Sequence, residues 1–134
     1  MRPYYGHTYN DAIAQLGVGG TALSVEESDV IDIISIDRQT GHAILTISDH
    51  LDWSDSIQHQ TILQTKLNAY LAFVESGQIL ENYPDAAGRS IVFKIVLKFK
   101  PNRGGREFLS KAQRIIESAG FTLRYELFAE SYDN

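Results

Sequence analysis

Between residues 29 and 127, the spacing of apolar residues changes along the chain. Some segments have the two-residue period of a β-strand, and others have the 3.6-residue period of a helix. The clearest strand begins at Ile91, where one set of apolar side chains alternates with Val92, Lys94, Val96 and Lys98. Two earlier segments rich in β-branched residues flank a polar loop and predict a β-hairpin. The predicted strands are 29–36, 43–47, 91–99 and 121–127.

Two helices are predicted between these strands, from Ser54 to Ser76 and from Arg103 to Ala119. Glycines follow both of them, as is common at helix ends. The connector 78–88 contains Pro84, which indicates a loop. The predicted inner faces are formed by Leu63, Leu67, Tyr70, Leu71 and Val74 in the first helix and by Phe108, Ala112, Ile115, Ile116 and Ala119 in the second.

The order of elements is therefore β-β-α-β-α-β. Because strand–helix–strand connections are right-handed, both helices are expected on one face of a mixed four-stranded sheet. The predicted fold is a two-layer α/β sandwich of the α+β type, with one sheet face free of helices. The 134 residues suffice for one domain, which we place at 29–134, after a partly flexible N-terminal extension at 1–28.

Composition excludes several classes of function. The chain has no cysteine, which excludes disulfides, thiolate catalysis and cysteine-ligated metal sites. No apolar run approaches the roughly 18 residues of a membrane span, and the N-terminus does not resemble a secretory signal. No dinucleotide, phosphate-loop or serine-hydrolase motif is present. We therefore expect a cytoplasmic protein without a membrane partner or a cofactor.

Charge is distributed unevenly along the sequence. Up to Asp85 there are twelve acidic and three basic residues, a net charge of −9, whereas the remainder has nine basic and five acidic residues, a net charge of +4. A fold that keeps the two halves apart will carry a negative and a positive side.

The junction between the second strand and the first helix gathers polar residues that could form a metal or ligand site. A carboxylate and an imidazole four residues apart share a helix face, and others in the preceding loop could complete a site for a divalent metal. Alternatively, Asp52 and Ser54 cap the helix while Trp53 covers its start. The candidate site residues are Asp49, His50, Asp52, Trp53, Asp55 and His59.

The helix-free sheet face is the second candidate site. It combines apolar and cationic side chains, which suits a protein partner or a second copy of the chain. Nucleic acid is disfavoured because the aromatic residues of these strands point to the opposite face. The candidate partner-binding residues are Val92, Lys94, Val96, Lys98 and Arg124.

Two motifs resemble a family of small bacterial proteins that is recorded as a domain of unknown function. The first, L-T-I-S-D-H-L-D-W, spans residues 45–53, and the second, K-L-N-A-Y-L-x-F-V-E-S-G, spans residues 66–77. The similarity extends over residues 29–127. It implies no activity, cofactor or catalytic residue.

These observations favour a non-catalytic interaction module that binds a protein partner or forms a homodimer. The alternative is a metal-binding protein or metal-dependent hydrolase that uses the acidic and histidine cluster at the start of the first helix. A small-ligand pocket beneath Trp53 and the loop at Tyr83 and Pro84 is a third hypothesis that the sequence leaves open.

Overall fold

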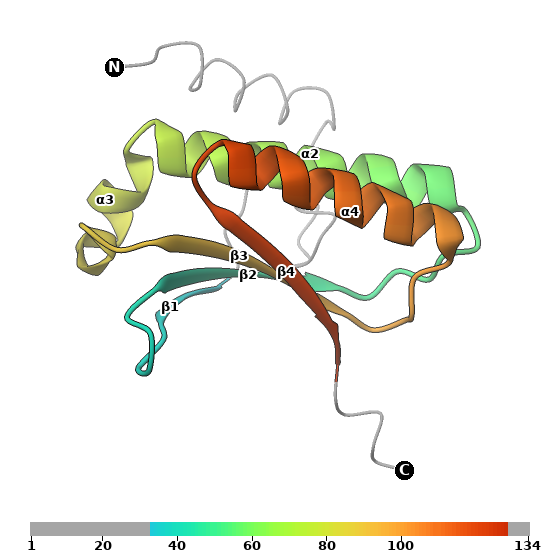
Figure 1. Cartoon of the computed structure of the whole chain (residues 1–134), viewed down its shortest axis with the longest axis horizontal. Helices are drawn as coiled ribbons and strands as arrows, with labels where there is room; N and C mark the ends of the chain where they lie inside the picture. The colour runs from blue at the N-terminus through green and yellow to red at the C-terminus, as the bar shows by residue number, and fades with distance from the viewer. Residues whose placement is uncertain (1–32, 129–134) are drawn as a thin grey trace.

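A computed structural model describes residues 33–128 (Figure 1). Its four strands form one sheet in the order β1-β2-β3-β4. β1 and β2 are antiparallel, and β2, β3 and β4 are parallel. The strands are β1 (Ile33–Ile36), β2 (Ala43–Asp49), β3 (Ile91–Leu97) and β4 (Thr122–Leu127). The extension predicted at 1–28 and the start of the hairpin predicted at 29–32 lie outside the described residues.

Two long helices, α2 (Ser56–Glu75) and α4 (Arg103–Ser118), connect the parallel strands. Both lie on the same face of the sheet, side by side (Figure 1). Both crossovers are right-handed and both proceed in the same direction across the sheet, so they place their helices on the same face. The predicted mixed four-stranded α/β sandwich is confirmed. Within residues 33–128, no helix is long and apolar enough to cross a bilayer.

The connector 78–88 differs from the predicted loop because it contains a short helix, α3 (Gln78–Asn82), and a 3₁₀ turn, η1 (Pro84–Ala86). Gly77 has a φ of 86°, a left-handed conformation that ends α2 and lets the chain turn into α3. Ile79 is buried and fixes α3 to the core. A short segment with one anchoring residue lacks the repeated apolar spacing that predicts a helix.

The core lies between the sheet and the helix layer. Alternate residues of the central strands point toward the helices and are fully buried. They are Ala43, Leu45 and Ile47 in β2 and Phe93, Ile95 and Leu97 in β3.

The inner face of α4 agrees with the predicted one at Ala112 and Ile116 but differs elsewhere. The buried row consists of Gly105, Leu109, Ala112 and Ile116, whereas Ile115 is 62% exposed. Phe99, the last residue of the predicted strand 91–99, is exposed because β3 ends at Leu97 and the chain bends away.

The sheet order separates the acidic and basic halves of the sequence. Residues 33–85, with seven acidic and two basic side chains, form β1, β2 and α2, whereas residues 86–128, with nine basic and three acidic side chains, form β3, α4 and β4. Sequential strand order places these halves next to each other, so the described part of the molecule is polarised from one sheet edge to the other.

Candidate functional site

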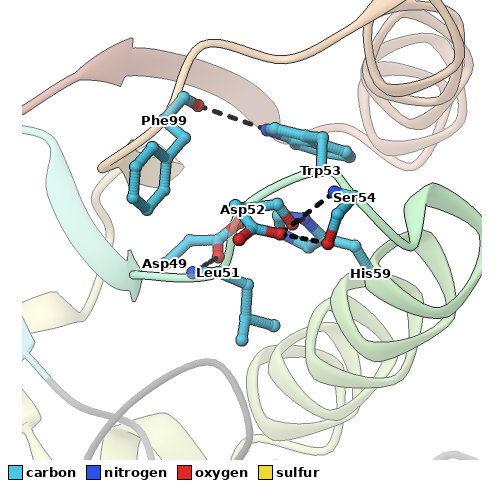
Figure 2. A network of polar contacts seen from close by, with 7 residues as sticks. All are labelled: Asp49, Leu51, Asp52, Trp53, Ser54, His59 and Phe99. Carbon is cyan, nitrogen blue, oxygen red and sulfur yellow. Dashed lines mark hydrogen bonds and ion pairs between the residues drawn. The ribbon is translucent and has the colours of Figure 1, made fainter.

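The predicted junction lies where the parallel strands β2 and β3 end and α2 and α4 begin. In open α/β sheets, ligands commonly bind outside the carboxyl ends of parallel strands. Here this position contains a buried polar cluster covered by Trp53 (Figure 2). The chemistry available depends on how these side chains are paired.

Asp49 and His59 form a buried pair at the centre of the cluster. Each residue is only 2% exposed, and Nε2 of His59 lies 2.5 Å from Oδ2 of Asp49 (Figure 2). The other carboxylate oxygen of Asp49 accepts a hydrogen bond from the backbone N–H of Leu51 at 3.1 Å. The other imidazole nitrogen, Nδ1, lies 3.0 Å from the carbonyl oxygen of Asp52.

These contacts determine how many protons the pair holds. A backbone carbonyl can only accept, so Nδ1 of His59 must carry a hydrogen. The 2.5 Å contact with Asp49 then requires one more proton, located on either the imidazole or the carboxyl group. In both cases the pair is neutral overall and both ring nitrogens are satisfied. With both residues buried and fully paired, the geometry matches a structural link between β2 and α2.

Trp53 closes the cluster. Its ring stacks on the His59 imidazole with centroids 3.7 Å apart, and its Nε1–H donates to the carbonyl oxygen of Phe99 at 3.2 Å. The side chain is 7% exposed. On α4, a Cβ at Gly105 would lie 2.7 Å from the tryptophan ring. Trp53 therefore fills the space between α2 and α4 in which an α/β protein would hold a ligand.

Replacement of Gly105 by alanine is expected to lower the free energy of unfolding by about 1–3 kcal/mol, because the added methyl would overlap the Trp53 ring. The neighbouring Gly104 is the matched control. A Cβ there would approach only side-chain ends, those of Gln60 and Ser56 at 3.3 Å and that of Asn102 at 3.7 Å. Gly104→Ala should therefore be nearly neutral in chemical denaturation, and equal losses for both variants would contradict this role of Gly105.

Asp55, rather than Asp52 or Ser54, caps α2. Oδ1 of Asp55 accepts from the backbone N–H of Gln58 at 3.2 Å, and the helix begins at Ser56. Asp52 caps the preceding turn instead, where its carboxylate accepts from the hydroxyl and the backbone N–H of Ser54. These hydrogen bonds hold the pKa of Asp52 below its usual range. The predicted caps, Asp52 and Ser54, lie three residues and one residue before Asp55, because the loop and the start of the helix have similar polar composition.

Four of the six predicted metal or ligand residues, His50, Asp52, Asp55 and His59, line one hollow of about 420 Å³ at the start of α2. Asp49 and His59 pair with each other, Asp52 and Asp55 accept from backbone amides, and His50 is exposed. Within residues 33–128, no group of three histidine, aspartate or glutamate side chains is arranged to hold a metal ion. The carboxylates of this loop mainly accept hydrogen bonds from backbone N–H groups.

The second predicted site lies on the helix-free face. Lys98 and Arg124 are exposed there, and Lys94 and Val96 are half-buried. Val92 is only 2% exposed, so it cannot contribute much contact surface to a partner. Lys94 lies 3.9 Å from the carboxylate of Glu126 on β4.

The two predicted sites meet at the end of the sheet. The backbone N–H of Lys98 donates to the carbonyl oxygen of Asp49 at 2.9 Å, which extends the pairing of β2 and β3. A hollow of about 350 Å³ lies next to this bond. It is lined by Ser48, Asp49, His50, Val96, Lys98 and Phe128.

Sequence comparison defines the family of the chain. A family model described as "Family of unknown function (DUF6572)" matches residues 23–129. The chain belongs to DUF6572. Comparisons with curated proteins and with solved structures give no match.

In this DUF6572 protein, Asn102 links the two helices and was missed as a site residue. Its Oδ1 accepts from the backbone N–H of Gly105 at 2.8 Å, which caps α4, and lies 3.3 Å from the hydroxyl of Ser56 on α2. An asparagine directly before a predicted helix is a signal for such a cap. Its contact with Ser56 of α2 could not be predicted from the local sequence, because the two residues are 46 positions apart.

The small-ligand pocket proposed beneath Trp53 and the loop at Tyr83 and Pro84 is not formed. Trp53 contacts Phe99, just beyond the carboxyl end of β3, whereas Tyr83 and Pro84 precede the amino end of the same strand. The two features lie at opposite ends of β3, so they cannot line one cavity.

Proposed function

We propose that this DUF6572 protein is a non-catalytic interaction module that binds a protein partner through the end of its helix-free sheet face. The observation that supports this proposal most directly is the hollow beside Val96, Lys98 and Phe128. Phe128 is 50% exposed and Lys98 is exposed, so apolar and cationic contacts are available side by side. This combination is typical of a site for an apolar side chain next to a carboxylate.

The state of the other candidate site also supports this proposal. A catalytic acid–base pair must reach its substrate, whereas Asp49 and His59 are covered by Trp53 and bonded to each other. The cationic side chains near the hollow include Lys94, Lys98 and Arg124. Because like charges repel, we expect an acidic rather than a basic partner surface.

The proposal predicts that Val96→Asp and Lys98→Glu each reduce capture of a specific partner about tenfold or more, because the first buries a charge in the apolar contact and the second reverses the cation. The measurement is quantitative mass spectrometry after affinity capture and cross-linking in the source cells. Lys111→Glu on α4 is the matched control, since it makes the same charge change on the helix layer. It should capture the same protein as the native chain.

Melting temperatures of all three variants separate loss of binding from loss of folding. Lys98 is exposed, so Lys98→Glu should leave the melting temperature nearly unchanged. Capture of the same proteins in the same amounts by Lys98→Glu, Val96→Asp and the native chain would exclude this surface as the binding site.

A further inference from the structure

A groove of about 360 Å³ lies between α2 and α4, the two helices that run side by side over the sheet (Figure 1). Its floor is apolar and consists of the buried side chains of Leu67, Ala112 and Ile116. Ile115 also lines the groove and is 62% exposed, and Phe108 is half-buried there. Exposed apolar side chains around an apolar hollow are typical of an interaction surface. The groove is therefore a candidate docking site on the helix layer.

Among the described residues, none of those that line this groove is acidic. On the α4 side lies Lys111, and on the α2 side lie the neutral amides of Gln60, Gln64 and Asn68. An adjoining hollow on α4 contains Lys111, Arg106 and Arg114, together with Glu107, which pairs with Arg103. The surroundings of the groove are therefore basic. An occupant that combines an apolar stripe with acidic residues would complement both properties.

The chain itself contains such a segment before β1. Residues 1–32 lie outside the described part of the structure, and their sequence has five acidic residues and one basic residue. Asn10 and Gly17 are residue types that commonly flank a helix, so the sequence predicts a short helix between them. Helical spacing would bring Ala12, Ile13 and Leu16 to one side of it and turn Asp11 and Ala14 to the other.

We propose that this predicted helix docks in the groove between α2 and α4 of the same chain, with Ile13 and Leu16 packed against Ile115 and the apolar floor. The connector, residues 18–32, spans up to about 50 Å when it is extended. This length exceeds the roughly 30 Å diameter of a small domain, so the helix can reach the groove from Ile33 at the start of β1.

The tether and the charges favour this segment over a second copy of the chain. A short linker gives the segment an effective concentration on the order of millimolar at the groove. The net charge of −4 on residues 1–32 is attracted to the basic side chains of α4, whereas a second copy would bring two basic helices together. A helix this short is marginal alone in water, so its formation depends on docking. The groove lies on the helix layer, and this inference is therefore independent of the proposed partner site at the end of the other sheet face.

Disulfide formation tests this placement in the full-length chain, which has no cysteine of its own. In a glutathione buffer, Ile13→Cys combined with Ile115→Cys should form an intramolecular disulfide about tenfold or more faster than two control pairs. The first control uses Ala14→Cys with Ile115→Cys, which moves one thiol to the opposite side of the predicted helix. The second uses Ile13→Cys with Thr122→Cys, which moves the other thiol to an exposed position on the helix-free face.

Hydrogen exchange provides a second measurement that needs no cross-link. In the native chain, the amides of residues 14–17 should exchange about tenfold or more slowly than those of an unstructured peptide. Ile13→Asp should abolish this protection, because docking would bury a charge. Ala14→Asp is the matched control, since it adds the same charge on the side that faces away from the groove, and it should retain the protection.

Four results would overturn the proposal. Two of them are equal rates of disulfide formation for all three pairs and a native segment without protection from exchange. Preferred linkage to Thr122→Cys would place the segment on the helix-free face, and linkage between two chains would show that it docks on another copy. Circular dichroism confirms that each variant is folded, which is expected because Ile115 and Thr122 are exposed.

Discussion

Asp49→Ala is expected to lower the free energy of unfolding by about 3–5 kcal/mol, measured by urea denaturation at neutral pH. The substitution leaves the His59 imidazole buried beneath Trp53 without its partner at Nε2. It also removes the acceptor for the backbone N–H of Leu51. A buried polar group that loses its partner retains the full cost of desolvation, and this cost accounts for most of the expected loss.

Asp49→Asn is the control that separates hydrogen bonding from charge. The asparagine amide can donate to Nε2 of a neutral His59, while its carbonyl oxygen accepts from Leu51, so most of the stability should remain. Asp52→Ala, an exposed carboxylate in the same loop, should cause a much smaller loss than Asp49→Ala. If all three variants were equally stable, the buried pair would contribute nothing to the fold.

The sequence contains the information that brings Asp49 and His59 together, although we predicted it only in part. Asp49 continues the helix-facing row of β2, after Leu45 and Ile47, and His59 continues the buried stripe of α2 that includes Leu63. Period two in the strand and period 3.6 in the helix therefore both point these polar side chains into the core. The prediction placed Asp49 in the preceding loop and grouped His59 with Asp55 on one helix face, which concealed the pairing.

Other features could not be predicted from local patterns because they depend on contacts between distant segments. The fit of Trp53 against Gly105 joins residues 52 positions apart, and nothing in the sequence near either one indicates it. The exposure of Phe99 depends on where β3 leaves the sheet. The two candidate sites meet because the parallel register places Asp49 beside Leu97.

Trp53 fills the end of the sheet at which the parallel strands terminate. An α/β protein that binds a ligand at the carboxyl ends of its strands needs space between the first turns of its helices. Here Trp53 occupies that space, and Asn102 bonds the start of α4 while contacting α2. The space between the first turns of α2 and α4 is therefore filled, which supports the proposed partner contact at the hollow beside Val96.

Trp53→Ala is expected to lower the free energy of unfolding by about 3–5 kcal/mol, the usual range for removing a large buried aromatic side chain. The substitution leaves a cavity between His59 and Gly105 and removes the donor to the carbonyl oxygen of Phe99. Trp53→Phe keeps a ring against His59 but lacks the Nε1–H, so its loss should be smaller. Both values are obtained from urea denaturation.

Combining Trp53→Ala with Gly105→Ala tests whether the tryptophan is the reason for the glycine. In the native chain the added methyl at residue 105 overlaps the ring, and Gly105→Ala is destabilising. Without the ring there is room for the methyl, and alanine is favoured over glycine in a helix by up to about 1 kcal/mol. The effect of Gly105→Ala should therefore change sign in the Trp53→Ala background. Equal destabilisation in both backgrounds would mean that Gly105 is required by the backbone of α4 and not by Trp53.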